Sequence, residues 1–196
     1  MRLALQVTEL KFLDWEPVNL ALQPGEVIGV SGTSGSGKSL LLRAIADLDV
    51  HSGGARLDGV DRDSIPAPEW RRRVAMLPAE PRWWLGSVGE HFHTESADLV
   101  GRLGFGVEVF GWEIARLSVG ERQRLALARL FDRQPEVLLL DEPTANLDGE
   151  ATRLVEQLVL ESGLATIWVS HDVDQLARVG RRQFVMADRR LREVGR

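Results

Sequence analysis

Short apolar runs alternate along the chain with longer amphipathic segments. Runs bounded by glycine, proline or polar residues predict β-strands, whereas apolar residues that recur every three or four positions predict helices. The predicted strands are 2–7, 18–22, 26–30, 55–57, 73–77, 137–140, 165–169 and 183–186. The predicted helices are 40–46, 118–131, 150–162 and 173–179. This alternation predicts an α/β fold whose core sheet is mostly parallel.

The segment 83–116 differs from the rest of the chain, because it combines short helical pieces with glycines and many aromatic residues. These aromatics either fill a small core or line a groove for a partner. Trp83 and Trp84 discriminate best between these alternatives, since two consecutive residues rarely both point inward. We expect one of the two at the surface or at an interface.

The composition narrows the classes of function. The 196 residues suit one compact domain. The formal net charge of −5 argues against a nucleic-acid-binding surface. The lack of cysteine excludes disulfides and thiolate metal sites and fits a reducing compartment. No apolar run is long enough for a membrane span, and the N-terminus turns polar too soon for a signal peptide.

A phosphate-binding loop is the strongest motif. The stretch Gly32-Thr33-Ser34-Gly35-Ser36-Gly37-Lys38-Ser39 fits the pattern G-x-x-x-x-G-K-[ST] in full. Its glycines let the backbone approach phosphates, Lys38 supplies a positive charge, and the Ser39 hydroxyl is a ligand for Mg²⁺. The alternative is a flexible Gly/Ser loop with a surface lysine. The strand before the loop and the helix after it favour the phosphate-binding interpretation.

Two carboxylates, Asp141 and Glu142, follow the apolar strand 137–140. Functional residues in open α/β sheets collect at the carboxyl ends of the strands. Asp141 there can hold Mg²⁺, and Glu142 can orient and deprotonate an attacking water. The alternative, a polar strand end that caps a helix, is weakened by the phosphate-binding loop upstream.

Four motifs in register resemble those of the ATP-binding cassette (ABC) ATPases. The run Leu138-Leu139-Leu140-Asp141-Glu142-Pro143-Thr144-Ala145-Asn146-Leu147-Asp148 is similar to the Walker B and D-loop sequence of that family. The run Leu117-Ser118-Val119-Gly120-Glu121-Arg122-Gln123-Arg124 resembles its signature motif, and Val169-Ser170-His171-Asp172 its switch histidine motif. The phosphate-binding loop also fits the family's form, G-x-S-G-x-G-K-S. The resemblance covers nearly the whole chain.

The resemblance implies one ABC domain over residues 1–196, with a nucleotide-binding core of 1–82 and 117–196. It adds a small antiparallel β subdomain and a compact helical subdomain, 83–116. ATP and Mg²⁺ are the implied cofactors, and the metal ligands are Ser39 and Asp141. The implied catalytic residues are Glu142, His171 and Lys38.

The same resemblance implies that two cassettes share each ATP. Ser118, the Gly120 backbone and Glu121 would face the γ-phosphate held by a second cassette, and Asp148 would contact that cassette. His171 would contact the γ-phosphate and help position the water. The alternatives are an ordinary helix cap for Ser118, which is compatible with the shared site, and a capping or core histidine for His171.

The resemblance also implies that an aromatic ring early in the chain stacks on adenine. Phe12 and Trp15 are the candidates, and Phe12 is preferred. The alternative is that both are core or turn residues.

The chain departs from the family pattern at three positions. Ala79 stands where the family has a glutamine that couples the nucleotide to the helical subdomain, which puts that coupling in question. Val119 replaces the first signature glycine and Glu121 the signature glutamine. Val119 requires a negative φ, and the charge of Glu121 favours its helix but weakens attraction for ATP. We expect measurable but slow ATPase activity.

Three functions compete. The favoured one is the cytoplasmic ATPase subunit of an ABC transporter, which a separate permease holds on the inner face of the membrane. This subunit would pair with a second cassette, and a homodimer is preferred to a heterodimer. The second is a soluble ABC ATPase that acts in protein or cofactor assembly. The third is a P-loop kinase or GTPase, against which the signature run argues. Nucleic acid is not an expected partner.

Overall fold

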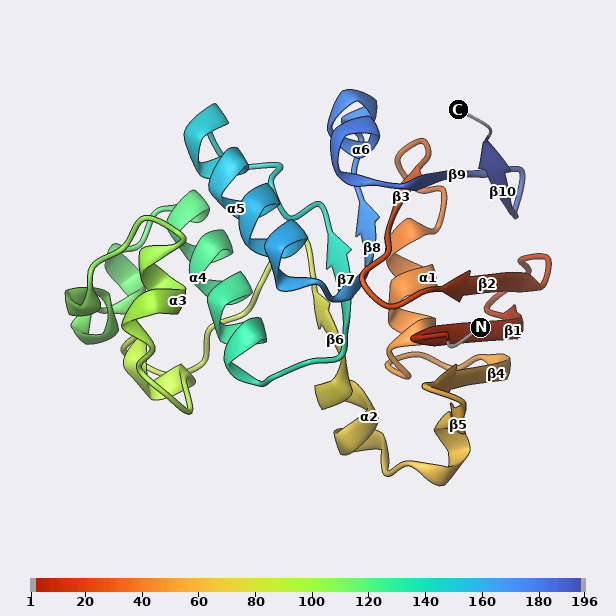
Figure 1. Cartoon of the computed structure of the whole chain (residues 1–196), viewed down its shortest axis with the longest axis horizontal. Helices are drawn as coiled ribbons and strands as arrows, with labels where there is room; N and C mark the ends of the chain where they lie inside the picture. Colours follow the sequence, from red (N-terminus) through yellow and green to blue (C-terminus); the bar gives the residue numbers. More distant parts are fainter. Residues whose placement is uncertain (1–2, 195–196) are drawn as a thin grey trace.

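The computed structural model describes residues 3–194, whose strands form two sheets (Figure 1). The core sheet has six strands in the order β10-β9-β3-β8-β7-β6. Its strands are β3 (Val27–Ser31), β6 (Val74–Leu77), β7 (Val137–Asp141), β8 (Ala165–Val169), β9 (Arg182–Ala187) and β10 (Arg190–Val194). All neighbours in this sheet are parallel except β9 and β10. The predicted, mostly parallel core sheet is confirmed.

The smaller sheet is antiparallel, with the order β2-β1-β4-β5. Its strands are β1 (Leu5–Lys11), β2 (Val18–Leu22), β4 (Ser52–Leu57) and β5 (Val60–Asp61). The α-helices are α1 (Lys38–Ile45), α2 (Ala67–Arg73), α3 (Ala97–Gly101), α4 (Val119–Asp132), α5 (Gly149–Ser162) and α6 (Val173–Val179). The short 3₁₀ helices are η1 (Arg62–Ser64), η2 (Gly89–His91), η3 (Val107–Gly111) and η4 (Ile114–Arg116).

The predicted elements all occur, with shifted ends. Strand β1 ends at Lys11 rather than at residue 7, and residue 2 of the predicted strand lies outside the described residues. A register shift between Val7 and Leu10, with Glu9 at φ +50°, interrupts the alternation that marks a strand in the sequence. Helix α2 and strand β10 were not predicted. Helix α2 buries only Trp70, and β10 is almost wholly exposed, so neither shows an apolar pattern.

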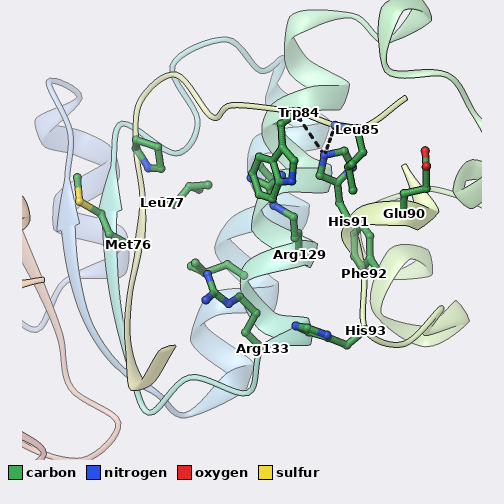
Figure 2. Close-up of a pocket in the computed structure, with 13 residues that line it drawn as sticks. Met76, Leu77, Trp84, Leu85, Glu90, His91, Phe92, His93, Arg129 and Arg133 are labelled. Atoms are coloured by element: carbon green, nitrogen blue, oxygen red, sulfur yellow. Dashed lines mark hydrogen bonds between the residues drawn. The ribbon is translucent and has the colours of Figure 1, made fainter. Parts of the chain in front are cut away.

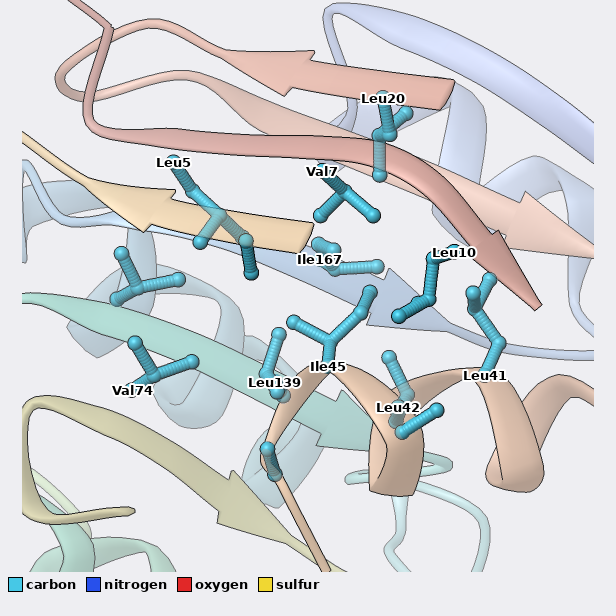
Figure 3. Packing of buried hydrophobic residues seen from close by; sticks show 14 of the residues in the cluster. Leu5, Val7, Leu10, Leu20, Leu41, Leu42, Ile45, Val74, Leu139 and Ile167 are labelled. Carbon is cyan, nitrogen blue, oxygen red and sulfur yellow. The ribbon is translucent and has the colours of Figure 1, made fainter. Parts of the chain in front are cut away.

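Helix α1 lies between the two sheets and joins them into one core (Figures 1 and 3). Leu41, Leu42 and Ile45 are fully buried there. They belong to one cluster with Val7 of β1 and Ile167 of β8. Because α1 begins at the phosphate-binding loop, this packing fixes the loop against the core sheet.

The second core cluster joins the core sheet to α4, α5, α6 and the segment 83–116. That segment has little regular helix, and α4 holds it through arginine side chains. Arg122 donates to the Ile114 carbonyl and Arg124 to the Leu103 carbonyl, and Arg129 donates to the Arg82 carbonyl just before the segment. No helix within residues 3–194 combines the length and hydrophobicity of a membrane span.

Candidate functional site

Four of the parallel strands end at the same edge of the core sheet, and the segments that follow them meet there. Strand β3 leads into the phosphate-binding loop, β7 ends at Asp141, β8 leads to His171, and β6 leads to Ala79. These segments line one cavity of about 260 Å³. The residues that line it are Ser34, Gly35, Ser36, Gly37, Lys38, Ser39, Leu40, Ala79, Asp141, Glu142 and His171. The structure therefore brings the predicted catalytic and metal-binding residues into one site.

The loop curls around the Lys38 ammonium group. Lys38 Nζ donates to the carbonyls of Gly32 at 2.9 Å and Thr33 at 3.0 Å. Gly37 caps α1 with φ +83°, a left-handed conformation that glycine adopts without strain. A Cβ atom added to Gly35 would meet nothing within 4 Å, so the loop is open at this point. This open backbone at a helix N-terminus is the cradle that a phosphate chain requires.

Burial lowers the pKa of Lys38, and the negative charges of Glu142 and Asp141 oppose that shift. The side chain is 7% exposed and is held by carbonyl groups rather than by a carboxylate contact. Its charge therefore remains available to an anion in the cavity.

Glu142 and His171 form a pair at the edge of the cavity. The backbone N–H of His171 donates to Glu142 Oε2 at 3.4 Å, and His171 Nε2 lies 3.4 Å from Glu142 Oε1. Burial raises the pKa of Glu142, and the neighbouring His171 opposes that rise. The raised pKa favours a carboxylate that accepts a proton, which is the property of a general base. Asp141 is the last residue of β7, directly before Glu142, and is itself buried.

The signature residues lie at the N-terminus of α4 and do not line the cavity of their own chain. Ser118 Oγ accepts from the Glu121 N–H at 3.2 Å, and Glu121 Oε2 accepts from the Ser118 N–H at 2.8 Å. This capping box explains why a glutamate suits position 121. Val119 starts the helix with a negative φ, as its side chain requires, and is 61% exposed. Asp148 is exposed and caps α5 by accepting from the Ala151 N–H.

The two candidate adenine platforms lie together but differ in exposure. Their rings stack with centroids 5.5 Å apart and planes inclined by 17°. Phe12 is 3% exposed and belongs to the core, so the preference for Phe12 is corrected by its burial. Trp15 is half-buried, and a Cβ atom on Gly37 would lie 2.9 Å from its ring. Trp15 is therefore the ring beside the phosphate-binding loop.

Ala79 lines the cavity at the position where the resemblance expects a glutamine. Its methyl group offers the cavity neither a donor nor an acceptor. The neighbouring Glu80 is exposed and is not among the residues that line the cavity.

Two residues beside the site were not among the predicted functional residues. Thr144 Oγ1 donates to Gln175 Oε1 at 3.0 Å, and this bond links the loop after Glu142 to helix α6. The two residues are 31 positions apart. Thr144 belongs to the run that resembles the Walker B and D-loop sequence, but no role was predicted for it, and Gln175 lies outside the quoted motifs.

Comparison with known proteins decides the family. The model of the ABC transporter family matches residues 15–145. The chain belongs to the ABC transporter family. The cassette is thus an ATP-binding ATPase domain, with the predicted P-loop NTPase fold of ABC type.

Relatives and solved structures agree with this assignment. The lipoprotein-releasing system ATP-binding protein LolD of Idiomarina loihiensis is 38% identical over 202 residues, covering 89% of this chain and 86% of LolD. Protein STAR1 of Oryza sativa subsp. japonica is 38% identical over 179 residues, covering 83% of this chain and 52% of STAR1. The chain thus spans about half of STAR1, and it covers 60% of the methionine import ATP-binding protein MetN of Xanthomonas axonopodis, which is 33% identical.

The fold is also that of cbiO1 from Clostridium perfringens, described as part of the ABC transporter complex cbiONQ. The TM-score is 0.82 at 24% identity, over 98% of this chain and 88% of cbiO1.

Proposed function

We propose that the cassette binds MgATP, hydrolyses it at the interface of a cassette dimer, and thereby powers transport through a separately encoded membrane permease. The observation that carries the proposal is the single cavity shared by the phosphate-binding loop, Asp141, Glu142 and His171. The names of LolD and MetN, a lipoprotein-releasing and a methionine import ATP-binding protein, support transport rather than assembly. Such a subunit would lie in the cytoplasm against the inner face of the membrane.

The residues present fit a magnesium ion that is bound together with phosphate. Ser39 and the buried Asp141 supply oxygen ligands in the cavity. Within residues 3–194 no group of three or more His, Cys, Asp or Glu side chains could hold a metal alone. This suits Mg²⁺, which is held by one or two carboxylates plus substrate phosphates. The bound ion would neutralise charge on the β- and γ-phosphates.

The remaining groups act on the phosphates and on water. Lys38 and the backbone N–H groups of the loop bind the phosphate chain. Glu142 orients the attacking water and accepts its proton, while His171 holds the Glu142 carboxylate and faces the γ-phosphate. The signature residues complete the site from a second cassette, since they do not line the cavity of their own chain. A homodimer is the simplest arrangement, with the exposed Asp148 at the interface.

We expect Trp15→Ala to weaken binding of a fluorescent ATP analogue, because Trp15 supplies the stacking surface. A stacked base is worth about 1–3 kcal/mol, or roughly a 5- to 150-fold change in Kd. Trp15→Phe keeps a flat ring and should retain most of the affinity. Trp84→Ala, which removes an exposed tryptophan far from the loop, is the matched control. An unchanged Kd for Trp15→Ala would exclude Trp15 as the platform.

We propose that the permease docks at a groove beside β6 (Figure 2). This cavity of about 470 Å³ lies between β6, α4 and residues 84–93. Trp84 is 69% exposed at its rim, which confirms that one of the two adjacent tryptophans reaches the surface. Arg129 supports it, with its guanidinium 4.4 Å from the Trp83 ring and 4.9 Å from the Trp84 ring. His91 fixes the turn, because its Nε2 accepts from the N–H groups of Trp84 and Leu85 at 3.1 Å.

The test of transport is whether a multi-span membrane protein co-purifies with the cassette from membranes of the native cell. Trp84→Ala should reduce co-purification, since a tryptophan at the centre of an interface is worth about 2 kcal/mol or more. The ATPase rate of the isolated cassette should not change. Val107→Ala removes another exposed apolar side chain of the same segment and serves as the control. A cassette that instead co-purifies with soluble scaffold proteins would favour the assembly function.

A further inference from the structure

Gln175 lies buried on α6 and connects two elements that flank the catalytic pair. It is 1% exposed. Its Oε1 accepts from Thr144 Oγ1 at 3.0 Å, and its Nε2 donates to Glu156 Oε1 of α5 at 2.9 Å. Because a carboxylate only accepts hydrogen bonds, Glu156 turns the amide nitrogen toward α5. The amide oxygen is thereby left facing the Thr144 hydroxyl.

The two ends of this connection reach Glu142 and His171. Thr144 stands two positions after Glu142. Gln175 belongs to the first turn of α6, where its backbone N–H donates to Asp172, the residue next to His171. The amide thus spans the loop of the base and the helix that begins just after the histidine.

Glu142 needs such support, because its backbone is in the left-handed region at φ +48°. A non-glycine residue keeps this conformation only where its surroundings determine it. On the side of the core sheet, the Glu142 N–H donates to the carbonyl of Val169, the last residue of β8, at 3.0 Å. On the other side, the chain turns back through Thr144, whose side chain is held by Gln175.

We propose that Gln175 is a positioning residue for ATP hydrolysis, which acts through Thr144 to hold the Glu142 carboxylate beside His171. The inference rests on the proposed role of Glu142 as the base. Neither Gln175 nor Thr144 lines the nucleotide cavity, so their contribution is to the geometry of the base and not to ATP binding.

The experiment removes the connection at either end. Thr144→Val replaces the hydroxyl by a methyl group of similar size, and Gln175→Leu removes the amide. We expect either change to lower kcat by about 10- to 100-fold, the loss that a displacement of roughly 1 Å causes at a catalytic group. KM for ATP and the Kd of a fluorescent ATP analogue should stay at wild-type values. Thr144→Ser keeps the hydroxyl and should restore the rate.

Arg178→Gln is the matched control. Arg178 is exposed and donates to the same Glu156 oxygen at 3.0 Å, so its loss disturbs the carboxylate but leaves the bond between Thr144 and Gln175. We expect this variant to hydrolyse ATP at the wild-type rate. An equal loss of activity in Arg178→Gln would overturn the inference in favour of a general effect on packing between α5 and α6.

A Glu142→Gln background separates positioning from general damage. Once the base is gone, Gln175→Leu should lower the residual single-turnover rate no further. A further loss there, or a wild-type kcat in Thr144→Val, would overturn the inference. If Gln175→Leu fails to fold, the Thr144 variants decide. If Glu142→Gln alone hydrolyses ATP at the wild-type rate, the result would instead overturn the proposed function itself.

Discussion

Glu142→Gln should stop hydrolysis and trap an ATP-bound dimer. The amide matches the carboxylate in size and can still accept from the His171 N–H, but it cannot take a proton from water. Loss of a general base typically costs about 10²–10⁴-fold in rate. The substitution also removes a negative charge that would face the γ-phosphate in the proposed site, so the closed dimer should persist.

Phosphate release measures the rate, and light scattering after size exclusion in MgATP measures the dimer. Glu69→Gln, on the remote helix α2, controls for loss of a glutamate charge. A variant that stays monomeric at high concentration with MgATP would contradict homodimeric closure and point to a different cassette as the partner. A rate equal to that of the wild type would remove Glu142 from the mechanism.

Two inactive variants should restore each other's activity when mixed, because we propose that each ATP site takes its two halves from two chains. Lys38→Ala removes the cation that the loop presents to the phosphates. Gly120→Asp damages the other half, because a Cβ atom there would lie 3.1 Å from the Asn146 carbonyl and the added charge would face phosphate. A heterodimer of the two variants keeps one site with an intact loop and an intact signature.

Each variant alone should hydrolyse ATP at background rate, and an equimolar mixture should recover activity that depends on total protein concentration. Gly101→Asp adds the same charge where a Cβ atom would meet nothing within 4 Å, and it should retain wild-type activity. A mixture that remains inactive, with each variant folded, would show that the site is completed within one chain.

The sequence predicts the parts of the site that lie in continuous motifs. The loop 32–39, Asp141, Glu142 and His171 each follow an apolar strand, and parallel strands must deliver their ends to one edge of the sheet. Ala79 reaches the same cavity for the same reason. The choice between Phe12 and Trp15 is different, because it depends on side-chain direction after the register shift in β1.

Contacts between distant residues also escape sequence reasoning. The bond between Thr144 and Gln175 depends on how α6 packs beside the loop after β7, and no periodic pattern reports that packing. Helix α2 was missed because it buries a single residue, Trp70, and one apolar position among arginines forms no helical periodicity. The capping box of Ser118 and Glu121, in contrast, is local, and the helix start at Ser118 followed from the sequence.

The arginine contacts of α4 have a consequence for the stability of the segment 83–116. Arg122 and Arg124 donate to the carbonyls of Ile114 and Leu103 within the segment, and Arg129 donates to that of Arg82 just before it. Burial lowers the pKa of Arg129 to about 10, which still leaves it charged at neutral pH. These bonds add to the short helices and turns of the segment and tie it to α4, so we expect the segment to open together with that helix. Amide hydrogen exchange across 83–116 would thus report on how firmly the segment is attached to α4, the helix whose N-terminus carries the signature residues.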